Sequence, residues 1–210
     1  MIKYRRFVCN PLEENTYVVW DEASRETAVA DCGAFTNGEK NDIASFIEEE
    51  HLHPTLALQT HMHFDHLFGL GWLKEKYGLR PVCHELEQKN YDMQEIMASD
   101  MFGVKLTLDR PGILRYIKDG EKLRLGENEL TVIHTPGHSP GGVCYLADTF
   151  LLSGDTLFAG SCGRADLPGG NMQDEIRSIK ERLITLREDI TVLPGHGPET
   201  TIAREKRYWI

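Results

Sequence analysis

The sequence predicts an α/β fold in which two similar halves pack as layers. Short apolar strands followed by helical segments occur twice along the 210 residues, and this alternation is typical of layered α/β domains. No low-complexity segment or long linker separates the two runs, and 40% of the residues are hydrophobic, which is enough for a sizeable core. We therefore expect one domain that spans residues 1–210.

In the first half, runs of apolar residues bounded by turn residues predict strands at 2–8, 16–20, 27–30, 56–59 and 81–83. Apolar residues at helical spacing predict helices at 39–51 and from Asp65 to about Tyr77, and a more polar helix should cover 85–97. Asn37 or Asn41 is the expected N-cap of the first helix. Residues 99–111 have no regular periodicity, although Met101, Phe102 and Val104 could cover a neighbouring element.

The second half repeats the pattern of strands followed by a helix. Strands are expected at 113–117, 122–125, 130–135, 142–147, 150–153 and 191–193. A helix is expected at 172–186 with Asn171 as its N-cap. The residues that predict its buried face are Met172, Ile176, Ile179, Leu183 and Leu186.

Composition narrows the classes of partner. Lys and Arg number 23 and Asp and Glu number 33, so the formal net charge is −10, and no basic stripe suits nucleic acid or an anionic membrane. The five cysteines are scattered and never spaced as Cys-x-x-Cys, which favours reduced thiols. No apolar run reaches the roughly 18 residues that a membrane span requires. These observations predict a cytoplasmic protein that acts on a small molecule.

The segment Thr60-His61-Met62-His63-Phe64-Asp65-His66 predicts a metal site. His61 and His63 are two positions apart, so they point to the same side if strand geometry continues. Asp65 and His66 add two further ligand types, which makes a second, adjacent ion conceivable. Imidazole and carboxylate suit zinc, iron or manganese, and the lack of thiolates argues against a closed structural zinc site.

Three more candidate ligands follow three later strands. His138 comes after the strand at 130–135, Asp155 after the strand at 150–153, and His196 after the strand at 191–193. A glycine precedes each of them and allows the backbone to turn sharply beside a site. His134 and the histidines near the end of the first helix are not expected to take part.

Seven ligands suit two divalent ions that share one carboxylate. Asp155 is the natural bridge, because a carboxylate can span two cations about 3.5–4 Å apart whereas a neutral imidazole cannot. Water held between two such ions becomes a nucleophilic hydroxide near neutral pH. Asp65 can ligate and also orient that hydroxide, so it is the expected catalytic residue, and zinc is the favoured metal.

The motifs together resemble the metallo-β-lactamase superfamily along nearly the whole chain. They are the segment 60–66, Thr135-Pro136-Gly137-His138-Ser139, Ser153-Gly154-Asp155-Thr156-Leu157-Phe158 and Leu193-Pro194-Gly195-His196-Gly197-Pro198-Glu199-Thr200. The resemblance implies a four-layer αββα sandwich with a binuclear site at one edge. It also implies a ligand assignment: one ion would take His61, His63 and His138, the other would take Asp65, His66 and His196, and Asp155 would bridge them.

Within that superfamily the chain looks similar to glyoxalase II, the hydroxyacylglutathione hydrolase, and to its small bacterial relatives. The similarity lies in Gly154-Asp155-Thr156-Leu157-Phe158 and Gly160-Ser161-Cys162-Gly163-Arg164. It implies hydrolysis of a thioester such as S-lactoylglutathione, with Arg164 as the clamp for a substrate carboxylate, which a planar guanidinium pairs with in two places. Asp166 stands where the larger enzymes place a Tyr.

Other activities use the same ligands. The segment Gly163-Arg164-Ala165-Asp166 also resembles the iron-dependent persulfide dioxygenases. In that branch His61, His138 and Asp155 would hold a single iron and leave positions for oxygen. A lactonase or another ester hydrolase is a variant of the hydrolase hypothesis. A non-catalytic metal-binding or scaffold protein would not require a second ion beside an aspartate.

Overall fold

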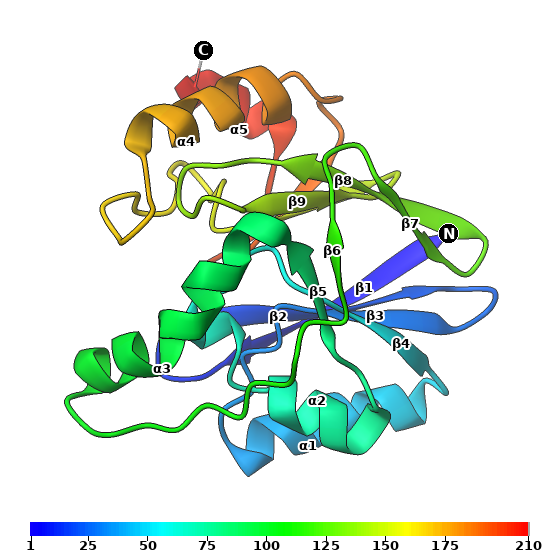
Figure 1. Ribbon diagram of the computed structural model, residues 1–210. Coiled ribbons are helices and arrows are strands. Elements are labelled where there is room, and N and C mark those ends of the chain that lie inside the picture. Colours follow the sequence, from blue (N-terminus) through cyan, green and yellow to red (C-terminus); the bar gives the residue numbers. More distant parts are fainter. Residues whose placement is uncertain (210) are drawn as a thin grey trace.

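A computed structural model describes residues 1–209 and contains two sheets of six strands each. The sheets pack face to face, and helices cover their outer faces, with α1 and α2 against the first sheet and α4 and α5 against the second (Figure 1). The four-layer αββα sandwich expected from the motifs is therefore confirmed. None of the helices within residues 1–209 has the length and apolar character needed to cross a membrane.

The first sheet follows the order of the chain. Its strands are β1 (Ile2–Cys9), β2 (Glu14–Asp21), β3 (Glu26–Ala30), β4 (His53–Leu58), β5 (Pro81–His84) and β6 (Arg115–Ile117). Strands β1 to β3 are antiparallel, whereas β4, β5 and β6 each run parallel to the preceding strand. Parallel neighbours require a crossover connection, and α1 supplies the one between β3 and β4.

The second sheet has a similar mixture of strand directions. Its strands are β7 (Lys122–Leu125), β8 (Asn128–His134), β9 (Val143–Leu146), β10 (Phe150–Gly154), β11 (Thr191–Pro194) and β12 (Thr200–Thr201). Strands β7 to β10 are antiparallel, β11 is parallel to β10, and β12 is antiparallel to β11. The carboxyl ends of β10 and β11 therefore reach the same edge of this sheet.

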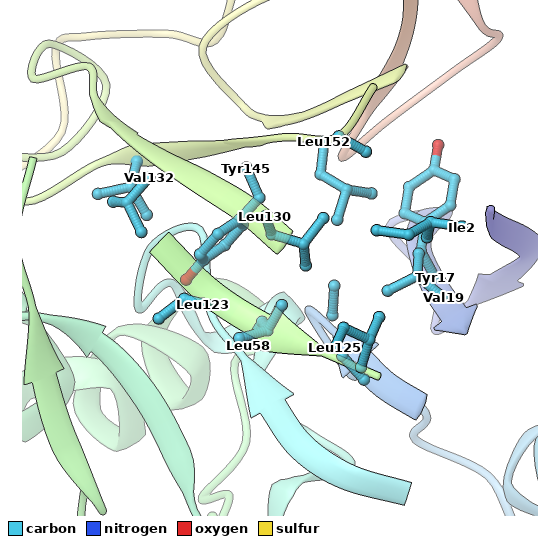
Figure 2. Close-up of a cluster of buried hydrophobic side chains, with 14 of the residues drawn as sticks. Ile2, Tyr17, Val19, Leu58, Leu123, Leu125, Leu130, Val132, Tyr145 and Leu152 are labelled. Carbon is cyan, nitrogen blue, oxygen red and sulfur yellow. The ribbon is translucent and has the colours of Figure 1, made fainter. Parts of the chain in front are cut away.

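Apolar side chains from both sheets fill the space between them. Figure 2 shows Leu58 of the first sheet near Leu123 and Leu125 of the second, and all three are almost fully buried. Burial of a side chain of this size stabilises the fold by roughly 1.5–3 kcal/mol. The Tyr145 hydroxyl donates a hydrogen bond of 2.7 Å to the Gln59 carbonyl, so it joins the second sheet to the end of β4.

Two helices pack against the outer face of the first sheet. Helix α1 (Asn37–Glu49) begins with a capping box between Thr36 and Glu39, so neither Asn37 nor Asn41 is the N-cap. The helix expected from Asp65 is a single 3₁₀ turn, η1 (Phe64–His66), and α2 (Leu70–Tyr77) begins only after Leu67. The short turn leaves the ligand segment free of the regular helical geometry.

Helix α3 extends beyond the predicted polar helix. A 3₁₀ turn, η2 (Glu85–Glu87), leads into α3 (Gln88–Phe102), which lies beside both sheets (Figure 1). Phe102, the last residue of α3, and Leu108 in the following segment pack in one apolar cluster with Phe64 of the ligand segment. Phe102 therefore covers a neighbouring element as expected, whereas Met101 and Val104 are exposed, and residues 99–102 belong to the regular helix α3.

The last two helices differ from expectation. Helix α4 (Met172–Ser178) is capped by Asn171 as predicted, but it continues as a π-helical turn, η3 (Ile179–Leu183). Met172 and Ile176 are exposed, and Glu175 is buried in their place. The predicted apolar face is correct only from Ile179 onward. A further helix, α5 (Ile202–Trp209), packs against η3 and was not expected from the sequence.

Candidate metal centre

All seven predicted ligands gather at one edge of the sandwich. His61, His63, Asp65 and His66 follow β4 of the first sheet, and His138, Asp155 and His196 follow β8, β10 and β11 of the second. Six of the seven are buried, and the His196 side chain is 24% exposed. The ends of these strands converge at this edge. The hydrogen bonds between neighbouring strands fix the strand ends, and these in turn hold the ligand residues that follow.

Three imidazoles form the first group. His63 Nδ1 lies 2.7 Å from His138 Nε2, which lies 3.2 Å from His61 Nε2. Their rings are nearly perpendicular to one another, so the nitrogen atoms converge on one point. This is the set that the family resemblance assigns to one ion.

The second group contains one carboxylate and two imidazoles. Asp65 Oδ2 lies 3.1 Å from His196 Nε2 and 3.8 Å from His66 Nε2. The ligand atoms of these three residues also lie within 4.8 Å of one another.

Asp155 lies between the two groups. Its Oδ1 is 3.5 Å from His66 Nε2, and its Oδ2 is 3.6 Å from both His138 Nε2 and His196 Nε2. One carboxylate oxygen therefore faces the second group, and the other faces both groups. This is the geometry that a carboxylate shared by two cations requires.

The outer ring nitrogens have partners that aim the inner ones. His61 Nδ1 contacts Thr60 Oγ1 at 3.0 Å, while His138 Nδ1 and His196 Nδ1 donate to the carbonyls of Arg164 and Leu12 at 2.6 and 3.1 Å. Such contacts fix the tautomer and leave Nε2 free as a ligand atom. Three histidines are therefore prepared to bind a cation through Nε2.

Several buried polar atoms of the centre have no hydrogen-bond partner among residues 1–209. They include His66 Nε2 and Asp155 Oδ1, which face each other, and His63 Nε2. An unsatisfied buried polar atom costs about 1–3 kcal/mol. Cations between the two groups would satisfy the inward-facing atoms, so the residues present fit a binuclear centre.

The electrostatics of the site also suit cations. Burial and the neighbouring His138 together lower the pKa of His63 to about 3, while burial and His66 lower the pKa of His61. Burial opposes charge on His66 as well, yet Asp65 and Asp155 raise its pKa well above the usual value. The carboxylates therefore favour positive charge at this position, and the neutral imidazoles beside it are available as ligands.

One glycine brings the backbone close to the bridging carboxylate. A Cβ atom at Gly195 would collide with Asp155 Oδ1 and would lie 2.9 Å from His66 Cε1. Asn15 donates its backbone N–H to the Gly195 carbonyl at 2.7 Å, which fixes this turn against β2. Only glycine fits here without displacement of a ligand.

Three buried side chains hold the ligand loops from behind and were not predicted from the sequence. Glu87 accepts hydrogen bonds from the N–H groups of Met62 and Gly141, both at 2.8 Å. Gln94 accepts from Phe64 N–H at 2.8 Å. Glu175 accepts from His138 N–H at 2.7 Å, and burial raises its pKa to about 8.

A cavity of about 380 Å³ opens onto the centre. Its apolar walls include Leu12, Phe64, Met97, Met101, Phe158 and Leu167. Arg164 also lines it, but this side chain is 61% exposed, and its guanidinium pairs with Asp166 at 2.7 and 2.9 Å. His134 lies outside the centre and stacks on His84 with ring centroids 4.3 Å apart, which agrees with its exclusion.

The αββα sandwich and the paired ligand groups define a metal-binding enzyme of the metallo-hydrolase class. A sequence model of the metallo-beta-lactamase superfamily matches residues 9–196, so the chain belongs to that superfamily. The chain is 36% identical over 208 residues to the probable metallo-hydrolase YqgX of Bacillus subtilis, with 98% of this chain and 95% of the relative covered. It is 31% identical over 204 residues to the hydroxyacylglutathione hydrolase GloC of Haemophilus influenzae, with 93% and 91% covered.

Two solved structures share the fold over almost their full length. The BLEG-1 B3 metallo-beta-lactamase superposes with a TM-score of 0.88 at 30% identity, covering 98% of this chain and 97% of that one. TTHA1623 in a di-iron-bound form superposes with a TM-score of 0.83 at 33% identity, covering 97% and 98%. The second structure contains two iron ions.

Proposed function

We propose that this protein hydrolyses a small-molecule thioester, such as the 2-hydroxyacyl thioester S-lactoylglutathione, at a centre that holds two divalent cations. Zinc is the metal we favour, with iron or manganese as alternatives. The observation that carries the proposal is the position of Asp155 between two complete ligand groups that open onto one cavity.

Bound divalent cations would supply a hydroxide near neutral pH and would polarise the carbonyl of a substrate. Asp65 lines the cavity, and His66 and His196 lower the pKa of its carboxylate despite burial. It is therefore ionised at neutral pH and can accept a hydrogen bond from a water that attacks the substrate. The apolar walls exclude other water from the reacting carbonyl.

Two observations support a thioester as the substrate class. The similarity to GloC, a hydroxyacylglutathione hydrolase, covers more than nine-tenths of both chains. Arg164 lies at the cavity, where its guanidinium can reach a substrate carboxylate. Its partner Asp166 competes for the same group, but both side chains are exposed and water screens the pair, so a substrate can displace Asp166.

The second ligand group favours hydrolysis over the dioxygenase alternative. A single iron held by His61, His138 and Asp155 would leave the group of Asp65, His66 and His196 without a cation, although the ligand atoms of these three residues already converge. A buried group of polar ligands that binds no cation has lost its water without compensation, which costs free energy.

Metal analysis and paired assays test the proposal. We expect two zinc ions per chain, turnover of S-lactoylglutathione and no oxygen uptake with glutathione persulfide. The Asp155→Ala variant should lose metal and at least a thousandfold in kcat, while Asp148→Ala, which changes an exposed carboxylate, should retain both. One iron per chain with oxygen uptake would overturn the proposal, as would turnover of a cephalosporin without turnover of any thioester.

A further inference from the structure

Helix α3 buries two polar side chains and exposes several apolar ones beside its charged residues. Its buried residues are Asn90, Tyr91, Gln94 and Ala98, and Asn90 and Gln94 belong to the hydrogen-bond network behind the ligand loop. Its exposed residues include Leu86 of the preceding turn, Met93, Ile96 and Met101. A surface helix normally has the reverse pattern. Apolar side chains kept exposed beside a metal centre indicate a surface that binds something.

Two cavities lie along this face. The first, of about 380 Å³, is the cavity of the metal centre, where α3 contributes Met97 and Met101. The second, of about 370 Å³, is lined by Leu86, Lys89, Asn90 and Met93 of the same face. Met93 and Met97 are one helical turn apart, so the two cavities follow each other along α3.

The opposite wall of both cavities is also one segment, residues 163–169. Gly163, Arg164 and Leu167 line the first cavity, and Pro168 and Gly169 line the second. The segment is held at both ends, because Gly163 N–H donates to the Asp155 carbonyl at 2.8 Å and Gly169 packs closely on Pro140. The two cavities are adjacent along the same two segments, and we refer to them together as the α3 groove.

Lys89 gives the far end of the α3 groove a positive charge. It is exposed, lines the second cavity, and makes no ion pair within residues 1–209. The nearby Asp92 accepts a hydrogen bond from Gln88 at 2.9 Å instead. In a chain with a net charge of −10, an unpaired cation at the end of an apolar groove is complementary to an anion.

We propose that the α3 groove binds an extended arm of the substrate, with an apolar body along Met97 and Met93 and an anionic end at Lys89. Met97 and Lys89 are eight positions apart on the helix, a span of about 12 Å at 1.5 Å per residue. The substrate class is therefore a long thioester with a terminal carboxylate or phosphate. The inference deepens the proposed thioesterase function and rests on it.

Binding and turnover of matched compounds test the inference. The compounds carry a four- or eight-carbon arm that ends in a methyl group or a carboxylate, placed on the acyl side in one set and on the thiol side in the other. Unreactive thioethers of the same shapes measure binding by calorimetry. Each compound is tested with the native protein, with Lys89→Glu, and with Lys74→Glu, which makes the same charge change on an exposed residue of α2.

We expect the eight-carbon carboxylate to bind at least tenfold more tightly than its methyl counterpart, and Lys89→Glu to abolish this difference. In turnover, Lys89→Glu should raise KM for that compound alone and leave kcat unchanged, and Lys74→Glu should change neither. If only the compounds with the arm on the acyl side respond to Lys89→Glu, the arm belongs to the acyl group of the substrate. If only the compounds with the arm on the thiol side respond, it belongs to the thiol.

Equal binding of all arms, or equal effects of the two Lys variants, would overturn the α3 groove even if thioesters are hydrolysed. Binding that depends on Lys89 without turnover of any thioester would support the α3 groove and contradict the thioesterase function. The two proposals therefore fail separately.

Discussion

Glu87 accepts a hydrogen bond of 2.8 Å from the N–H of Met62, the residue between the ligands His61 and His63. The other carboxylate oxygen accepts from Gly141 N–H, close to the ligand His138. One buried side chain thus holds ligand loops that belong to the two different sheets. Its role is to position the ligands, since it does not contact the reacting atoms.

Replacement of Glu87 should weaken metal binding. Glu87→Ala leaves two buried N–H groups unpaired, so we expect a loss of about 2–4 kcal/mol in the free energy of unfolding of the metal-free protein. Support of this kind is typically worth about 10–100-fold in metal affinity. Urea denaturation and competition with a chelator measure the two effects. Glu87→Gln keeps one acceptor oxygen, so its stability and metal affinity should lie between those of the native protein and Glu87→Ala. Native metal affinity in both variants would contradict the positioning role of Glu87.

A methyl group at Gly195 should displace the bridging carboxylate. The added Cβ would occupy the position of Asp155 Oδ1, so Gly195→Ala should lower metal content from two ions toward one and reduce kcat. Overpacking of this kind costs about 1–3 kcal/mol of stability. Gly112→Ala is the control, because no atom lies within 4 Å of the Cβ it would add. Two tightly bound ions in Gly195→Ala would show that Asp155 does not bridge.

Asp21 makes stability depend on pH far from the metal centre. Although burial opposes it, hydrogen bonds from Ser24 and from Glu127 N–H lower the pKa of Asp21 to about 2 from 3.8. A lowered pKa stabilises the folded state above the unfolded value, and this contribution disappears as pH falls from about 4 to 2.

The Asp21→Asn variant should therefore be less stable than the native protein at pH 7, and the difference should narrow below about pH 4. Because water near these loops screens the charge, we expect only about 1 kcal/mol at pH 7. Urea denaturation across this pH range measures the difference, with the exposed Asp42→Asn as the control. A constant difference at every pH would mean that packing, not the charge of Asp21, is responsible.

The pair between Arg164 and Asp166 should regulate the affinity for an anionic thioester. Asp166→Asn releases the guanidinium and should lower KM for S-lactoylglutathione up to about fivefold, a small effect because an exposed ion pair is weak. Arg164→Gln should raise KM about tenfold with little change in kcat. Steady-state kinetics measure both, and Arg204→Gln changes an exposed arginine on α5 as the control. Unchanged KM in both variants would remove Arg164 from substrate binding.

The ligands could be identified from the sequence because each follows a strand and four of them are nearly contiguous. His61 to His66 form a local motif, and the glycines beside Asp155 and His196 mark the sharp turns. The four-layer fold came from the resemblance that these motifs carry, together with the repeated alternation of strands and helices. Both kinds of signal are local, so they did not require knowledge of which segments meet in space.

The supporting residues could not be predicted in this way. Glu87 and Gln94 belong to a segment that looks like an ordinary solvated helix, and nothing in their spacing shows that they face buried N–H groups. Similarly, Glu175 lies on the buried face of α4 where Ile176 was expected, because it accepts a hydrogen bond from His138 N–H. The walls of the α3 groove were missed because α3 and residues 163–169 are far apart in the sequence, and only the fold places them around the same cavities.

Each proposed cation takes ligands from both sheets, since His138 completes the first group and His196 the second. Metal occupancy is therefore linked to the docking of the two halves of the sandwich. By mass action, a ligand that binds only the assembled state stabilises that state in proportion to the logarithm of its concentration. Loss of metal would therefore weaken the packing of the two sheets first at this edge. The metal centre would thus stabilise the fold as well as serve the reaction.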